Sequence, residues 1–162
     1  MLKFISQLFT TATLGFNAAI AQANPPQVVI HPETGNRYFL TDILSWEEAR
    51  DAAIAAGGHL VTINDEPENQ WLAEQFLGEG VDFLWIGISD RATEGEFEWV
   101  SGQPVTYTNW APGEPNDNPE RGGEDFGVLT GPANPFDRPI GSWSDAPTPA
   151  KLRGIVEIDR QN

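Results

Sequence analysis

Residues 109–118 have the sequence NWAPGEPNDN and bring together side chains that suit a metal ion. The carboxylates of Glu114 and Asp117 alternate with the amides of Asn116 and Asn118, and no Lys or Arg lies in the segment. Carboxylates held this close together repel one another unless a counter-charge offsets them. A bound cation is one such counter-charge, because Ca²⁺ prefers carboxylate and amide oxygens as ligands.

Further acidic residues recur in the second half of the chain, which is rich in Gly, Pro, Asn and Asp. The candidate carboxylates are Asp90, Glu94, Glu114, Asp117, Glu124, Asp125 and Asp145. No Cys or His is among them, and ligands made only of oxygen favour a hard cation such as Ca²⁺. Acidic loops are also common as plain solvated surface, so composition leaves that alternative open.

The N-terminus predicts export from the cell. Within residues 1–23, Lys3 precedes a mostly apolar run, and Ala21-Gln22-Ala23 supplies small residues for cleavage. We therefore expect a secretory signal peptide that is removed after about Ala23. A short membrane anchor is the alternative, but polar residues interrupt the run before it reaches the length of a membrane span.

The composition indicates one domain and excludes some partners. The 162 residues carry a formal net charge of −15, and such an acidic surface repels nucleic acid and anionic membranes. There are no cysteines, so an exported domain must be stabilised by its core, by metal, or by both. Six tryptophans and nine phenylalanines supply material for a large apolar core.

Two helices are expected in the first half of the chain. Residues 45–56 begin with a capping box, formed by Ser45 and Glu48, and end at a pair of glycines. A second helix begins after Asp65. Short apolar runs predict strands at residues 28–30, 37–40, 59–63, 83–88, 97–100 and 154–158. Long loops occupy much of residues 101–150, and loops of this length tend to be functional.

Several segments resemble a known family in content and in order. They are SWEEARDAAIAAGGHLVTI, WIGISDRATEGEFEWVSGQPVTYTNWAPGEPND, GGEDF, SWSD and GIVEI. Together they resemble the C-type lectin-like domain over about residues 34–158. The resemblance implies an α+β fold with two helices, small antiparallel sheets and a long calcium-binding loop region. It divides the chain into a signal peptide (1–23), a lead-in (24–33), the domain (34–158) and a C-terminal tail (159–162).

The resemblance also implies two calcium sites. In the family, EPN, a later Glu and WND build a principal site that binds sugar directly. The residues expected to contact carbohydrate are accordingly Glu114, Asn116, Glu124, Ser144 and Asp145. An auxiliary site corresponds to Asp90, Glu94, Asp117, Glu124 and Asp125. The expected metal ligands are therefore Asp90, Glu94, Glu114, Asn116, Asp117, Glu124, Asp125 and Asp145, and the Glu114–Pro115 bond is expected to be cis.

The order of residues in EPN carries an expectation about the sugar. In the family, EPN accompanies mannose-type sugars (mannose, glucose, fucose and N-acetylglucosamine), whereas QPD accompanies galactose. A sugar hydroxyl donates to a carboxylate and accepts from an amide. Glu114 and Asn116 would therefore hold two neighbouring hydroxyls together with the calcium ion.

This chain departs from the family pattern at several positions. Ser144 stands where the family has Asn, and its shorter hydroxyl is a weaker calcium ligand and removes an amide donor to the sugar. The cysteine positions of the family correspond here to Ala53 with Val156 and to Phe126 with Thr148. Apolar packing is expected to take the place of the disulfides.

Two functions are compatible with these residues and motifs. The first is a calcium-dependent lectin for mannose-type glycans. The alternative, which Ser144 favours, is a calcium-stabilised domain that binds a protein or a surface such as ice. An enzyme is not expected, because the chain has no Cys nucleophile, no GxSxG and no HExxH. Trp143, next to Ser144, fits either the core or the sugar site, and no segment indicates an oligomeric state.

Overall fold

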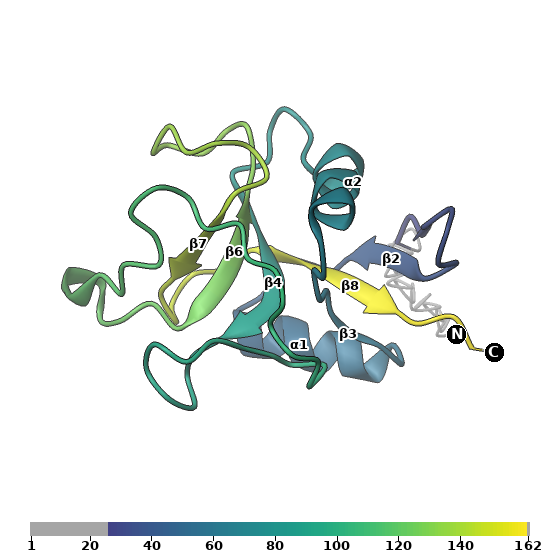
Figure 1. Cartoon of the computed structure of the whole chain (residues 1–162), viewed down its shortest axis with the longest axis horizontal. Helices are drawn as coiled ribbons and strands as arrows, with labels where there is room; N and C mark the ends of the chain where they lie inside the picture. The colour runs from purple at the N-terminus through teal and green to yellow at the C-terminus, as the bar shows by residue number, and fades with distance from the viewer. Residues whose placement is uncertain (1–25, 162) are drawn as a thin grey trace, which may run out of the picture.

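The computed structural model describes residues 26–161, and its helices lie where the sequence predicts them (Figure 1). Helix α1 spans Trp46–Ala55 and helix α2 spans Glu66–Phe76. The predicted capping box begins α1, since Ser45 Oγ accepts the Glu48 N–H (3.2 Å) and the Glu48 carboxylate accepts the Ser45 N–H (2.9 Å). Asp65 begins α2 by accepting a backbone N–H of the first turn (2.9 Å).

The predicted signal peptide, residues 1–23, lies outside the described residues and stays a prediction, as do the domain boundaries. Within residues 26–161, no helix is long and apolar enough to cross a membrane. Part of the lead-in forms strand β1 (Val29–Ile30), which pairs with β2 (Arg37–Leu40) at one edge of the sheet, as its apolar run predicts.

The strands of the described chain form one connected sheet in the order β1-β2-β8-β4-β6-β7, with β3 paired to β8 and β5 to β4. The remaining strands are β3 (His59–Leu60), β4 (Phe83–Ser89), β5 (Glu98–Trp99), β6 (Phe126–Thr130), β7 (Trp143–Ala146) and β8 (Arg153–Ile158). The α+β class is confirmed, but the sheet is not wholly antiparallel. Strands β4 and β8 run parallel, with Leu84 opposite Arg153.

Two strands are not predicted by the sequence patterns, and both lie within the loop-rich second half of the chain. Strand β6 reads FGVLT and β7 reads WSDA, so each contains residues that are disfavoured in strands. They nevertheless pair in antiparallel register, with Phe126 opposite Ala146 and Val128 opposite Ser144. Tertiary pairing therefore overrides local propensity here, and it places Trp143, Ser144 and Asp145 of the SWSD motif on a strand rather than in a loop.

Trp143 belongs to the core, which resolves the alternative that the sequence leaves open. Its ring is fully buried, and its Nε1–H donates to the side-chain oxygen of Asn69 on α2 (2.8 Å). Edge-on contacts with Trp99, Tyr107 and Trp110 surround it at centroid distances of 5.5–5.7 Å. This aromatic group attaches the start of the long loop to β7 and α2.

Apolar packing occupies the positions where the family has cysteines. Ala53 of α1 and Val156 of β8 are fully buried in one cluster. Phe126 is also fully buried, and its ring stacks on Trp46 of α1 with a centroid distance of 4.5 Å. Thr148, the fourth of these positions, is exposed. In the second of these pairs, Phe126 with Thr148, the Phe126 position on β6 is therefore held by an aromatic contact.

We predict that Phe126→Ala lowers the free energy of unfolding by about 3–5 kcal/mol, because it empties a fully buried aromatic site. Urea unfolding followed by tryptophan fluorescence measures this loss. The matched control is Ile43→Ala, at a side chain that is 62% exposed, which should change the stability by less than about 0.5 kcal/mol. Equal effects of the two substitutions would contradict the proposed role of Phe126.

Candidate functional site

Backbone hydrogen bonds attach the segment 109–118 to β7 on both sides of Trp143. The Trp143 N–H donates to the carbonyl of Asn109, and the Ala111 N–H donates to the carbonyl of Trp143, each at 2.7 Å. The Glu114–Pro115 peptide bond is cis, as the resemblance predicts. These contacts bring the EPN motif next to the SWSD motif.

Asp145 connects the two motifs through its carboxylate, which is almost fully buried. Its Oδ2 accepts the backbone N–H groups of Asn116 (3.0 Å) and Asp117 (2.7 Å), and its Oδ1 lies 3.2 Å from the Asn116 nitrogen. Hydrogen bonds from backbone donors to a charged carboxylate are among the stronger ones in proteins. Asp145 therefore fixes the backbone immediately after the cis proline.

Two protein donors contact the Glu114 carboxylate, one of which the sequence patterns do not predict, and the Asp145 carboxyl group lies beside it. Its Oε2 accepts a hydrogen bond from the Asn116 side-chain amide (2.7 Å), and its Oε1 forms an ion pair with the guanidinium of Arg138. Arg138 also lies within hydrogen-bond distance of Ser144 Oγ (3.4 Å). We call Glu114, Asn116, Ser144 and Asp145 the EPN cluster. Its counter-charge comes from a residue 24 positions after Glu114.

The sequence does contain a signal for Arg138, although a weak one. It is the one basic residue between Gly122 and Ala150, in a stretch otherwise rich in acidic and turn-forming residues. An isolated cation there has several carboxylates as potential partners, but only the fold shows which one it contacts.

A second group of carboxylates lies where β4 ends and β6 begins. Ser89 pairs with Phe126 across these strands, so Asp90 and Asp125 lie side by side, and the Asp90 N–H donates to the Asp125 carbonyl (3.2 Å). Glu94, from the turn after β4, completes the group. Carboxylate oxygens of Asp90, Glu94 and Asp125 lie within 4.8 Å of one another, and we call these residues the acidic cluster.

The acidic cluster fits a hard cation. Asp90 is only 2% exposed, and its Oδ2 accepts the Gly95 N–H (2.9 Å), whereas its buried Oδ1 has no hydrogen-bond donor. A buried carboxylate oxygen without a donor is costly unless a cation compensates it. Three carboxylates within reach of one ion supply part of the six to eight oxygens that Ca²⁺ takes.

The pKa values of both clusters reflect this crowding of charge. Burial raises the pKa of Asp90, and the charge of Asp90 raises the pKa of Glu94. The pKa of Glu114 is raised to about 7, first by burial and then by its interaction with Asp145, while the Arg138 guanidinium opposes the rise. In each cluster, a nearby positive charge would therefore stabilise the ionised carboxylates.

The predicted site residues thus divide between two clusters, and two of them connect the clusters. Asp117 donates its backbone N–H to Asp145, and its Oδ1 accepts the Glu124 N–H (3.0 Å). The Glu124 carboxylate in turn accepts the Asn118 N–H (3.3 Å). Asp117 also contributes to the negative field that acts on Glu94. The structure therefore places Asp117 and Glu124 between the EPN cluster and the acidic cluster.

A pocket of about 340 Å³ opens next to the EPN cluster. Its polar side contains Asn116, Asn118, Glu124, Arg138, Ser144 and Asp145. Its apolar side includes Phe83 and Phe136, whose rings lie 6.1 Å apart between centroids. The pocket is therefore lined by both hydrogen-bonding and aromatic side chains.

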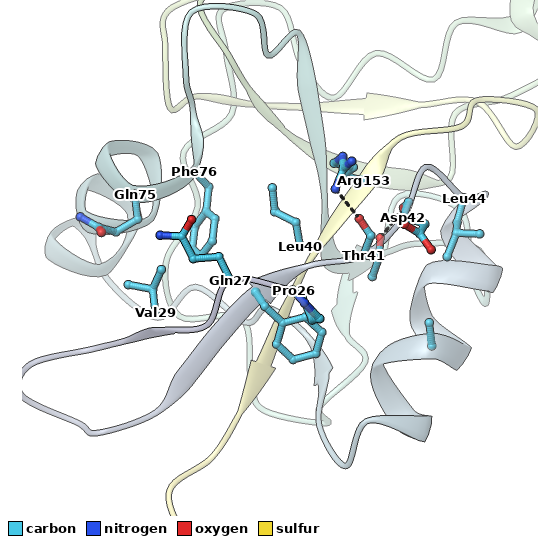
Figure 2. A pocket seen from close by; sticks show the side chains of 12 residues that line it. Pro26, Gln27, Val29, Leu40, Thr41, Asp42, Leu44, Gln75, Phe76 and Arg153 are labelled. Atoms are coloured by element: carbon cyan, nitrogen blue, oxygen red, sulfur yellow. Dashed lines mark hydrogen bonds between the residues drawn. The ribbon is translucent and has the colours of Figure 1, made fainter. Parts of the chain in front are cut away.

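A larger cavity, about 610 Å³, is a different one and shares no lining residue with the clusters (Figure 2). Residues of β1, β2, α1 and α2 line it, and Asp42 and Arg153 are its charged members. Arg153 donates to the Thr41 carbonyl (3.2 Å), the contact drawn in Figure 2. This cavity has no grouping of carboxylates, so the chemistry is concentrated at the smaller pocket.

Comparison with known proteins matches this chain to one domain family. The model of the family described as "Lectin C-type domain" matches residues 42–146. The human C-type mannose receptor 2 is 36% identical over 127 residues, which cover 78% of this chain and 8% of the receptor. The chain thus spans only a small part of that relative.

Solved structures agree with the fold. The carbohydrate-recognition domain of the mouse scavenger receptor C-type lectin is 30% identical, with a TM-score of 0.70, covering 86% of this chain and 98% of that domain. The carbohydrate-recognition domain of cow CD23, crystallised in the presence of a GlcNAc2Man3 oligosaccharide, is 28% identical, with the same TM-score and coverage. The lectin-like fold implied by the sequence motifs is confirmed.

We predict that Asp90→Asn raises the free energy of unfolding of the chelator-treated domain by about 1 kcal/mol, because it removes one of three mutually repelling charges. In saturating calcium the order should reverse. The parent gains about 2.7 kcal/mol at a hundredfold excess over Kd, and the variant gains much less. Urea unfolding in chelator and in calcium measures both effects.

The control for this prediction is Glu79→Gln, at an exposed carboxylate outside both clusters, which should respond to calcium as the parent does. If the parent is equally stable in chelator and in millimolar calcium, the acidic cluster does not bind the ion.

Proposed function

The chain belongs to the C-type lectin domain family, and we propose that it binds mannose-type carbohydrate in a calcium-dependent manner. The family is one of binding domains rather than enzymes, in agreement with the absence of catalytic motifs from the sequence. Mannose-type glycans here include those that present mannose, glucose, fucose or N-acetylglucosamine.

One observation carries the proposal. Of the five residues that the family motifs assign to carbohydrate, four line the single pocket beside the EPN cluster: Asn116, Glu124, Ser144 and Asp145. Its volume of about 340 Å³ lies in the range of small-molecule sites, roughly 300–1,000 Å³. Residues from the loop, from β7 and from the segment before β6 thus converge on one space large enough for a sugar ring.

The polar and apolar side chains that line the pocket suit the hydroxyls and the C–H groups of a pyranose. Carboxylates accept hydrogen bonds from sugar hydroxyls, and the amides of Asn116 and Asn118 both donate and accept. Phe136 is 45% exposed, and the part of its ring that Arg138 does not cover offers apolar surface for the C–H groups of the sugar. The CD23 domain, a neighbour at 28% identity, was crystallised in the presence of a mannose-containing oligosaccharide, which supports this choice of ligand.

Calcium, in this proposal, is held by the acidic cluster, with Asp117 and Glu124 close by as further ligands. The ion would supply the positive charge that compensates the buried Asp90. Because Asp117 and Glu124 also contact the EPN segment and its neighbours, calcium would order the loop that forms the pocket. Chelation should therefore weaken sugar binding through loss of loop order.

A protein or a surface such as ice remains the second candidate ligand. Ser144 favours it, because serine stands where the family has an amide, and its side chain is fully buried beside Arg138. We also propose that the domain is exported, on the basis of the predicted signal peptide, and we expect neither nucleic acid nor a membrane as partner.

A glycan array in calcium and in chelator tests the proposed function. Binding to mannose-type glycans in calcium, with a loss on chelation, is the expected result. An array without any bound glycan, while calcium still raises the melting temperature, would favour the protein or surface ligand instead.

We predict that exchanging Glu114 and Asn116 for Gln and Asp shifts the preference from mannose-type toward galactose-type sugars. The exchange conserves charge, and it replaces the Asn116 amide, which lines the pocket and both donates and accepts, with a carboxylate that only accepts. A different arrangement of hydroxyls is then satisfied. Glycan arrays of parent and variant measure the shift.

Calcium-dependent stability is the internal control, because the acidic cluster is unchanged in the double variant. An unaltered sugar profile in a variant that keeps this stability would mean that Asn116 does not contact the sugar.

A further inference from the structure

We propose that Arg138 is the resident cation of the EPN cluster, so that this cluster recognises its ligand without a metal ion. In the family pattern a principal calcium ion joins Glu114, Asn116, Glu124 and Asp145 to the sugar. Here the guanidinium of Arg138 already provides positive charge at that place. The nature of the ligand rests on the proposed function, but the identity of the cation does not.

The carboxylate of Glu114 is committed to protein donors on both oxygens. One oxygen pairs with Arg138, and the other accepts from the Asn116 amide at 2.7 Å. The Glu114 side chain is 4% exposed and that of Arg138 is 21% exposed, so water screens their pairing only weakly. A calcium ion bound to Glu114 would have to displace the guanidinium or lie against its charge.

The other members of the EPN cluster are engaged in a similar way. The Asp145 carboxylate accepts from two successive backbone N–H groups, and Ser144 Oγ lies 3.4 Å from Arg138. Ser144 also lacks the amide oxygen that the family uses as a ligand. The donor set therefore does not fit a calcium ion in this arrangement, in contrast to the acidic cluster with its buried Oδ1 that has no donor.

The loop before β7 is built so that it holds Arg138 in this position. Asn134 Oδ1 accepts the backbone N–H groups of Phe136 (3.2 Å) and Arg138 (3.0 Å). Its amide nitrogen donates to the carbonyls of Gly131 (2.8 Å) and Arg138 (3.2 Å). The guanidinium then lies over the Phe136 ring, 4.6 Å from its centroid. Both the backbone and the side chain of Arg138 are therefore fixed.

A guanidinium is chemically suited to the role of the missing ion. It stays charged at all relevant pH values and presents five N–H donors in a fixed plane. Sugar hydroxyls can accept from those donors while they donate to Glu124 in the same pocket. A calcium ion would bind the sugar through open coordination positions. Recognition by a guanidinium does not need such positions, because it uses hydrogen bonds.

Counting the calcium ions bound per chain tests the proposal. Equilibrium dialysis of the parent should find one ion, which Asp90→Asn removes or greatly weakens and Glu114→Gln leaves unchanged. Arg138→Gln should add a second ion with a Kd of about 10⁻⁴–10⁻³ M, and combining it with Glu114→Gln should remove that ion again. Arg138→Lys, which keeps the charge and guards against misfolding of the neutral variant, should bind one ion.

The matched control is Arg50→Gln, because Arg50 also pairs with a carboxylate, Asp51 at 2.7 Å, but on the surface of α1. It should bind calcium as the parent does. If the parent binds two calcium ions and Glu114→Gln loses one of them, the proposal is overturned. A folded Arg138→Gln variant that still binds only one calcium ion would also overturn it. Neither count involves sugar, so a failure of the proposed lectin function would appear separately, on the glycan array.

Discussion

The loop half of this domain depends on the neutralisation of carboxylates that the fold brings together and buries. Asp90, Glu114 and Asp145 are each almost inaccessible to solvent as side chains, although the chain as a whole is strongly acidic. A buried charge without a partner destabilises a fold by several kcal/mol, so each of these groups requires a donor or a cation. Asp145 uses backbone N–H groups and Glu114 uses a guanidinium, whereas Asp90 has an oxygen that no donor contacts. These three ways of compensating a buried carboxylate determine the conformation of the surrounding loops.

These charges are held in place by strands that are buried and paired with their neighbours. Strand β6 lies between β4 and β7, and its residues are buried along their whole length. The pairing of Ser89 with Phe126 brings Asp90 next to Asp125, and the burial of Trp143 fixes the strand that carries Asp145. Where related domains have cysteines, Phe126 stacks on Trp46 instead. Aromatic packing thus takes over part of the structural role of a covalent link, without any constraint on the unfolded chain.

The extent to which this arrangement is predictable from sequence differs between residues for physical reasons. The helices are predictable because capping by Ser45 and Asp65 is local, and the EPN and SWSD motifs identify the acidic residues by resemblance. Strand β7 is not predictable from the sequence, because WSDA becomes a strand only through its pairing with β6. The role of Arg138 is not predictable either, because its contact with Glu114 spans 24 residues and depends on a turn organised by Asn134. The segment NWAPGEPNDN contains no basic residue, so the sequence leads us to expect a metal ion as its counter-charge. In the fold, Arg138 provides a positive charge next to Glu114 of this segment.

Two different cations, one exchangeable and one covalently part of the chain, have different consequences for the proposed function. A metal ion bound at the acidic cluster would respond to the surrounding calcium concentration, whereas the guanidinium of Arg138 is present under all conditions. Asp117 is hydrogen-bonded to Asp145 and to Glu124, its charge acts on Glu94, and Glu124 precedes Asp125 in the chain, so a cation at the acidic cluster would influence the order of the EPN cluster. If Arg138 holds the ligand and calcium orders the loop around the pocket, the metal controls the fraction of molecules in which the pocket is formed. It does not control which groups contact the sugar. A change in calcium then scales the apparent affinity by the fraction of formed pockets, as expected when a ligand binds only one of two conformations. The selectivity among sugars would be the same at every calcium concentration, because the groups that distinguish them belong to the protein itself.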